Sequence, residues 1–260
     1  MMLAILLVFL LPLLFPSSLS AQSLSSFAEV MAAANRHYED ARYDQAVADY
    51  KTILAAGIRN SDVYYNLGNA YYRQRDLGRA ILNYRRAQWL EPRDADISAN
   101  LRLARVQTVD RLDISGTAQA GFGQIVGRWF TLDEISFLLL ALWLLICLCL
   151  SLAILVPRYR RLWRWLIAAC TVLLLFGLVA VVSHVYTRQQ FPEAVVVAPK
   201  IDATSGPGPT DQYAVEFTLH AGAEVNLLER RLGWRRVALP GDLQGWIPAE
   251  AVELVIDEGN

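Results

Sequence analysis

Two long hydrophobic stretches dominate the pattern of hydrophobic and polar positions along the chain. Residues 135–156 and residues 166–186 contain no Asp, Glu, Lys or Arg. Each stretch has roughly twenty residues, so as a helix it would extend about 30 Å, the thickness of the hydrocarbon core of a bilayer. Buried helices of soluble proteins seldom run this long without a charge, so the pattern predicts two transmembrane helices.

The short segment between these stretches, residues 157–165, is strongly basic and contains no acidic residue. Its arginines are Arg158, Arg160, Arg161 and Arg164. Short loops that are rich in arginine stay in the cytoplasm. We therefore expect a hairpin with a cytoplasmic turn, so that the regions before and after it both lie outside the cytoplasmic membrane.

The chain begins with an apolar segment, residues 1–16, which small and polar residues follow up to residue 22. This pattern predicts a secretory signal over residues 1–21, with cleavage near Ala21. No Lys or Arg precedes the apolar core, so an uncleaved signal anchor is the alternative. In both cases we expect a multi-pass protein of the bacterial inner membrane, with periplasmic domains on both sides of the hairpin.

The first exported region contains an internal repeat of about 34 residues, which is the period of the tetratricopeptide repeat. The second copy carries the residues of that repeat at the right spacing, namely Tyr64, Leu67, Gly68, Tyr71, Ala80, Tyr84, Ala87 and Pro92. The first copy is weaker but in phase, with Ala34, Tyr38, Ala46 and Tyr50. Apolar residues at helical spacing form the packing stripe of each helix. The pattern predicts an all-α solenoid with repeats at 27–60 and 61–94 and a capping helix at 95–112.

Resemblance to peptide-clamping tetratricopeptide proteins places a binding groove on the first helix of each repeat. The expected groove residues are Asn35, Tyr38, Tyr65, Asn69, Tyr72 and Arg73. Asparagine side chains both donate and accept, so they can bind the backbone of an extended peptide. Arg73 can bind a carboxylate, and the tyrosines offer flat anchors. The alternative is that all six residues are ordinary solvated or packing residues.

After a glycine-rich linker at 113–130 and the hairpin, the pattern changes to short alternating or β-branched runs over residues 194–256. Five strands are expected, at 194–197, 224–228, 235–239, 245–247 and 251–255. This pattern predicts a small all-β barrel. Two tryptophan-containing segments, 233–237 and 245–248, resemble those of bacterial Src-homology-3-like domains. Trp234 and Trp246 are the candidate ligand surface of this domain, and the alternative is that they pack in its core.

Composition and charge exclude several classes of function. The chain has 260 residues and a formal net charge of −1, so it lacks the basic excess that binds nucleic acid. The cysteines, Cys147, Cys149 and Cys170, all lie in the hydrophobic stretches, so no disulfide is expected in the exported parts. No nucleophile motif, phosphate-binding loop or metal-binding cluster occurs in the sequence. We expect a protein that is not an enzyme and uses no cofactor.

The order of signal, repeats, hairpin and Src-homology-3-like domain resembles the BatE family of Bat (aerotolerance operon) proteins. The resemblance covers nearly the whole chain and is most specific at residues 100–112. It implies a membrane scaffold linked to oxidative or envelope stress. Its implied partners are membrane proteins with von Willebrand factor A domains and, indirectly, a MoxR-type AAA+ ATPase. The alternative function is a cell-wall-binding anchor or envelope sensor, in which the C-terminal domain binds peptidoglycan.

Overall fold

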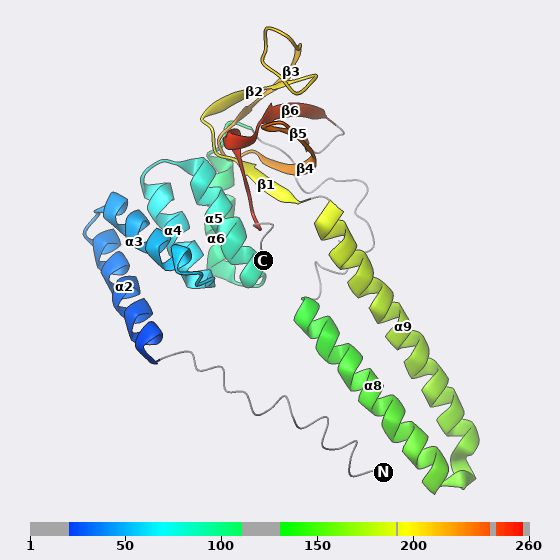
Figure 1. Cartoon of the computed structure of the whole chain (residues 1–260). Coiled ribbons are helices and arrows are strands. Elements are labelled where there is room, and N and C mark those ends of the chain that lie inside the picture. Colours follow the sequence, from blue (N-terminus) through cyan, green and yellow to red (C-terminus); the bar gives the residue numbers. More distant parts are fainter. Residues whose placement is uncertain (1–20, 111–130, 191, 240–242, 257–260) are drawn as a thin grey trace.

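The computed structural model describes residues 21–110, 131–190, 192–239 and 243–256. It contains an array of short helices, an antiparallel sheet above it and two long helices that extend away from both (Figure 1). These three parts confirm the helical repeat region, the two long apolar helices and a C-terminal all-β region. The expected linker at 113–130, and the expected signal apart from Ala21, lie outside the described residues.

The array consists of two helical pairs and a further helix. The helices of the array are α2 (Ala21–Glu39), α3 (Tyr43–Ala55), α4 (Ser61–Arg73), α5 (Leu77–Leu90) and α6 (Ala95–Val106). Three of them begin at a residue whose side-chain oxygen accepts the backbone N–H three residues later, which satisfies a free donor of the first turn. These residues are Asn60, Asp76 and Asp94.

Small residues let the helices of the second pair approach closely. A Cβ atom at Gly68 would lie 2.8 Å from the ring carbons Cδ1 and Cε1 of Tyr84 and 3.3 Å from the carbonyl oxygen of Ala80. Gly68 is therefore required where α4 crosses α5. The residues that fill the array core around this crossing are buried, among them Leu67, Tyr71, Ile81 and Leu101.

The two long helices are α8 (Leu132–Leu155) and α9 (Arg160–Gln190), joined by the short 3₁₀ segment η3 (Pro157–Tyr159). We call α8, η3 and α9 together the helical hairpin. The segments Asp133–Leu155 and Pro157–Ser183 are long and apolar enough to cross a membrane, and only 6% and 11% of the residues in their most apolar parts are buried. Both helices therefore expose apolar side chains, unlike the core helices of a soluble domain.

The basic turn of the hairpin is shorter than the sequence pattern indicates. Residues 160–165, which we expected in the turn, form the first turns of α9. Arginine favours helix, and Pro157 stands at the start of η3, where its missing N–H costs nothing. The arginines of this segment therefore show where the apolar stretches end, but they do not show where α9 begins.

Among the described residues, seven strands form one antiparallel sheet in the order β3-β2-β6-β5-β4-β1-β7. The strands are β1 (Glu193–Val196), β2 (Lys200–Thr204), β3 (Val215–His220), β4 (Glu224–Arg231), β5 (Trp234–Ala238), β6 (Gln244–Pro248) and β7 (Val252–Leu254). The two edge strands do not pair with each other, so the closed barrel is not confirmed. The five expected strands are present, but β2 and β3 were not expected, because their sequences mix polar and apolar residues beside a Gly- and Pro-rich loop.

The sheet packs directly on the array, although the hairpin separates them in the sequence (Figure 1). Val195 and Val255 from the sheet are buried in the same apolar core as Ile81 of α5 and Leu101 of α6. A bidentate ion pair between Arg93, after α5, and Glu134 of α8 joins the array to the hairpin, with N···O distances of 2.5 and 2.9 Å. The array, sheet and hairpin are thus connected by side-chain contacts as well as by the chain.

Candidate protein-binding site

The array contains an open pocket of about 310 Å³. Side chains from the helices α2, α4, α5 and α6 line it, namely Tyr38, Asn69, Tyr72, Arg73, Tyr84, Asn100 and Leu103. Four of the six expected groove residues are among them. We call this feature the pocket.

Each repeat contains the same hydrogen bond between its two helices. The Tyr50 hydroxyl donates to Asn35 Oδ1 at 2.7 Å, and the Tyr84 hydroxyl donates to Asn69 Oδ1, also at 2.7 Å. Burial raises the pKa of Tyr50 to about 12 and raises that of Tyr84 as well, so both hydroxyls keep the proton that they donate. These contacts assign the oxygen of each asparagine amide to the tyrosine.

A second set of bonds links each unit to the next. Asn66 Nδ2 donates to Asn35 Oδ1 at 3.4 Å, and Asn100 Nδ2 donates to Asn69 Oδ1 at 3.0 Å. The donors are again 34 positions apart in the sequence, as are the acceptors. Each of the two acceptor oxygens therefore receives two hydrogen bonds, which fills both of its lone pairs.

This network leaves one amide acceptor, Asn100 Oδ1, available in the pocket. Asn100 Nδ2 uses both of its hydrogens, because it also donates to the Tyr65 hydroxyl at 2.9 Å. The Asn69 amide also forms a side-chain hydrogen bond with Tyr65. Within the part of the chain that the structure describes, Asn100 Oδ1 has no hydrogen-bond partner. A peptide backbone offers N–H groups, which match this acceptor.

A cation and an apolar side chain lie beside these amides. Arg73 Nε donates to the Tyr38 hydroxyl at 3.3 Å, and this hydrogen bond raises the pKa of Arg73, which is charged and exposed. Tyr38 itself packs edge-on against Tyr43, with ring centroids 5.5 Å apart. Leu103 lines the pocket with 52% of its surface exposed. The pocket can therefore contact a carboxylate and an apolar side chain as well as a backbone.

Two of the residues that we expected in the groove, Asn35 and Tyr65, lie beside the pocket rather than in its lining, and three lining residues were not predicted. Asn35 and Tyr65 hold the amide network, since each accepts a hydrogen bond from another array residue. Tyr84, Asn100 and Leu103 were not expected in the groove. Their repeat spacing was a signal that could have found them, because Tyr84 corresponds to Tyr50, Asn100 to Asn66 and Leu103 to Asn69.

The two tryptophans of the sheet differ in burial. Trp246 has 7% of its surface exposed, and a Thr204 side chain donates to its backbone oxygen at 3.1 Å. Trp234 is half-buried in β5, where it pairs with Arg231 and Pro248 of the neighbouring strands. The burial of Trp246 favours the packing interpretation, and Trp234 remains the more accessible of the two.

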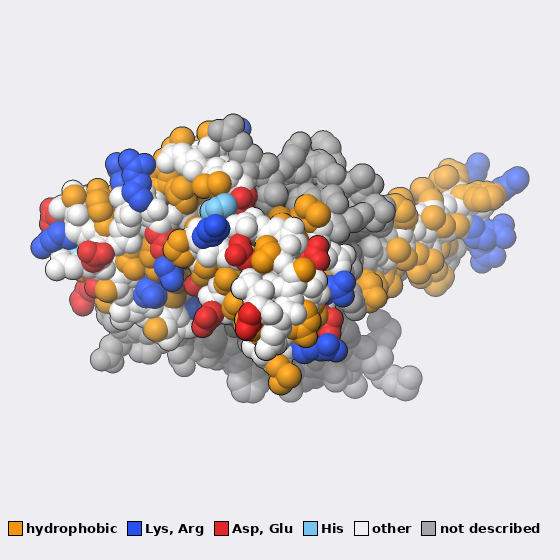
Figure 2. Space-filling model, turned by 90° about the horizontal axis from the view of Figure 1, so that it is seen from above, with side chains coloured by type: hydrophobic (Ala, Val, Ile, Leu, Met, Phe, Trp, Pro, Cys, Tyr) orange, Lys and Arg blue, Asp and Glu red, His pale blue; other side chains and the backbone are white. Residues whose placement is uncertain are grey.

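The four expected topology residues gather at one end of the molecule. Arg158, Arg160, Arg161 and Arg164 are all exposed. Figure 2 shows apolar side chains along the helical hairpin and basic ones at its far end. This distribution is the one expected of a hairpin that crosses a bilayer and keeps its basic end at the lipid surface.

Comparison with known proteins identifies one repeat. The family model of the tetratricopeptide repeat matches residues 61–94, which cover α4 and α5. No curated protein matches the chain. The match supports an interaction scaffold with protein partners, because tetratricopeptide repeats are typically non-catalytic modules that mediate protein–protein interactions.

Proposed function

We propose that this protein is a membrane-anchored scaffold that binds an extended segment of a partner protein in the pocket. The observation that carries the proposal is an open pocket in which the amides of Asn69 and Asn100 lie beside the side chains of Arg73 and Leu103. Backbone recognition by amides is independent of sequence, so the neighbouring side chains must supply specificity. Arg73 selects an acidic residue or a terminal carboxylate, and Leu103 selects an apolar side chain.

The helical hairpin is the proposed membrane anchor. Its apolar side chains are exposed along both helices, and burial in lipid would remove this surface from water. Its four exposed arginines favour a cytoplasmic end, so the array and the sheet belong in the periplasm. This orientation also agrees with the secretory signal expected over residues 1–21.

The proposed partner follows from the resemblance to the BatE family. By that resemblance, the scaffold acts in a Bat-type complex linked to oxidative or envelope stress. The segment in the pocket would come from a membrane protein with a von Willebrand factor A domain, and a MoxR-type ATPase would act on the complex indirectly. The order of repeats, hairpin and C-terminal all-β region along the chain supports this assignment.

The proposal is tested by placing two negative charges in the lining of the pocket. The variant combines Arg73→Glu with Leu103→Asp, and both side chains are exposed, so the array should still fold. The matched control is Arg102→Glu, at an exposed position of α6 that does not line the pocket. The measurement is the recovery of a co-expressed von Willebrand factor A-domain Bat protein with the tagged full chain from solubilised membranes.

We expect the double variant to lower recovery by at least about tenfold and the control to leave it unchanged. Full recovery with the double variant would exclude the pocket as the binding site. If the unmodified chain does not recover that protein at all, the Bat assignment fails while the pocket remains open to another partner.

The alternative, a cell-wall anchor, requires a ligand surface on the sheet. Trp246 is buried, so Trp234 is the residue on which that function would depend. Sedimentation of the full chain with purified peptidoglycan tests this alternative. Binding that is lost in Trp234→Ala would favour the anchor over the scaffold.

A further inference from the structure

The outer face of α5 differs from the same face of α3 in the first repeat. Ile81 is fully buried and Arg85 is mostly buried, whereas Val47 is half-buried and Lys51 is exposed at the corresponding positions of α3. Gly222 of the sheet, with a φ of +94°, approaches Ile81 so closely that a Cβ atom would lie 2.9 Å from its Cδ1 atom. The sheet therefore covers on the second repeat a face that the first repeat leaves open.

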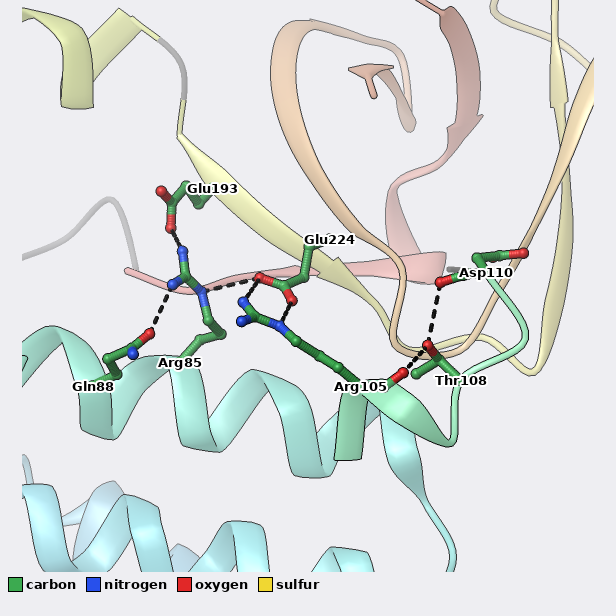
Figure 3. Close-up of polar contacts among 7 residues, drawn as sticks. All are labelled: Arg85, Gln88, Arg105, Thr108, Asp110, Glu193 and Glu224. Atoms are coloured by element: carbon green, nitrogen blue, oxygen red, sulfur yellow. Dashed lines mark hydrogen bonds and ion pairs between the residues drawn. The ribbon is translucent and has the colours of Figure 1, made fainter. Parts of the chain in front are cut away.

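Arginines of the array meet glutamates of the sheet across this contact (Figure 3). Arg105 of α6 binds Glu224 through two hydrogen bonds of 2.6 and 2.8 Å. Arg85 Nε lies 3.1 Å from the same carboxylate, and another nitrogen of Arg85 donates to Glu193. Burial lowers the pKa of Arg85, but Glu193 and Glu224 outweigh that effect and raise it, so the group is charged.

A third arginine donates hydrogen bonds to backbone carbonyl groups at the edge of the sheet. Arg86 of α5 donates to the carbonyl oxygens of Leu254 at 2.8 Å and Val255 at 3.3 Å. Leu254 is the last residue of β7, which is an edge strand, and Val255 follows it directly. Edge strands offer unpaired backbone groups, and the array occupies some of those groups here.

The helix α6 contacts both the pocket and the sheet. Asn100 and Leu103 line the pocket, while Arg105 binds Glu224. Just beyond the helix, Asp110 accepts the backbone N–H of His220 at 2.6 Å. The position of α6, and with it one wall of the pocket, therefore depends on groups that the sheet supplies.

We infer that the C-terminal sheet is the built-in intramolecular partner of the array, docked on the outer face of α5 and holding α6 in place. The chain's own sheet covers this face. Its glutamates Glu193, Glu224 and Glu253 lie opposite arginines of the array and complement their charge. These arginines are Arg79, Arg85 and Arg105. The sheet acts as the terminal cap of the repeats. This role stands whether or not the pocket binds the proposed partner.

The test is hydrogen–deuterium exchange of the full chain in detergent micelles, read by mass spectrometry on peptides from α6. The first variant is Glu224→Arg, which places a positive charge against Arg85 and Arg105. The matched control is Glu216→Arg, the same change at an exposed position of β3. We expect α6 to exchange at least tenfold faster in Glu224→Arg, α3 to keep its protection, and Glu216→Arg to exchange as the unmodified chain does.

Two further variants separate docking from general damage. Adding Arg105→Glu to Glu224→Arg restores an opposite pair and should slow the exchange of α6 again. Gly78→Ala should strengthen α5 by helix propensity, yet its Cβ would lie 2.9 Å from the backbone oxygen of Val196, so α6 should exchange faster. If α6 keeps its full protection in both Glu224→Arg and Gly78→Ala, the sheet does not hold it and the inference is wrong.

Discussion

At the scale of single residues, two buried tyrosine hydroxyls orient the amides of the array. Tyr50 and Tyr84 donate to Asn35 and Asn69 at the same distance in successive repeats. Because each amide oxygen is held in this way, the orientation of both amide groups is fixed. The amide of Asn69, which lines the pocket, is thus oriented by a hydrogen bond within its own repeat.

Removing the Tyr50 hydroxyl should lower the stability of the array and make that stability depend less on pH in the alkaline range. Tyr50→Phe loses one hydrogen bond, so we expect the free energy of unfolding to fall by about 1 kcal/mol at neutral pH. Burial raises the pKa of Tyr50 from 10.0 to about 12, so the unfolded chain loses this proton first as the pH rises. The stabilisation is complete below pH 10.0 and is lost as the pH rises toward about 12.

Urea unfolding in micelles, followed by circular dichroism on both sides of pH 10, measures both effects. The unmodified chain should lose stability above that pH more steeply than Tyr50→Phe. Equal slopes in the two proteins would show that the buried phenol does not contribute to the pH dependence.

At the scale of elements, the crossing of α4 and α5 is set by one glycine. Gly68 faces the Tyr84 ring, which is buried and held by its hydrogen bond to Asn69, so the ring has little room to move. The same ring lines the pocket. The crossing therefore fixes both the packing of the second repeat and part of its binding surface.

Gly68→Ala should destabilise the array although alanine favours helix. The added methyl group would meet the Tyr84 ring at 2.8 Å, and overpacking of this kind costs about 1–3 kcal/mol. Thermal unfolding of the full chain in micelles measures the change. A gain in stability, which helix propensity alone would give, would show that α4 and α5 can separate without cost.

Sequence patterns predicted elements better where contacts are local. The hydrophobic stripes of the repeats and the apolar stretches of the hairpin depend on near neighbours, and both appear in the structure. Strands β2 and β3 were not predicted because they contain polar residues such as Lys200 and Glu216, which break the apolar pattern. Pairing with each other stabilises these strands instead. The docking of Glu224 on Arg105 joins residues 119 positions apart, and no local pattern encodes such a contact.

At the scale of the whole molecule, the hairpin is expected to insert with its arginines inside the cell. Protease added to intact spheroplasts should digest the array and the sheet and leave a protected fragment that contains α8 and α9. Replacing Arg158, Arg160, Arg161 and Arg164 with glutamate should reduce the amount of that fragment, because the signal that retains the turn is lost. Mass spectrometry of the protected fragment measures both results, and an undigested array in intact spheroplasts would contradict this topology.

Because the sheet docks on the array, the regions before and after the hairpin form one folded body. The array precedes α8 and the sheet follows α9, so both outer ends of the hairpin are attached to one folded body, with Arg93 and Glu134 adding a direct tie. With the hairpin in a bilayer, this body would lie next to the lipid surface. A partner that is itself a membrane protein would then be well placed to present a segment to the pocket.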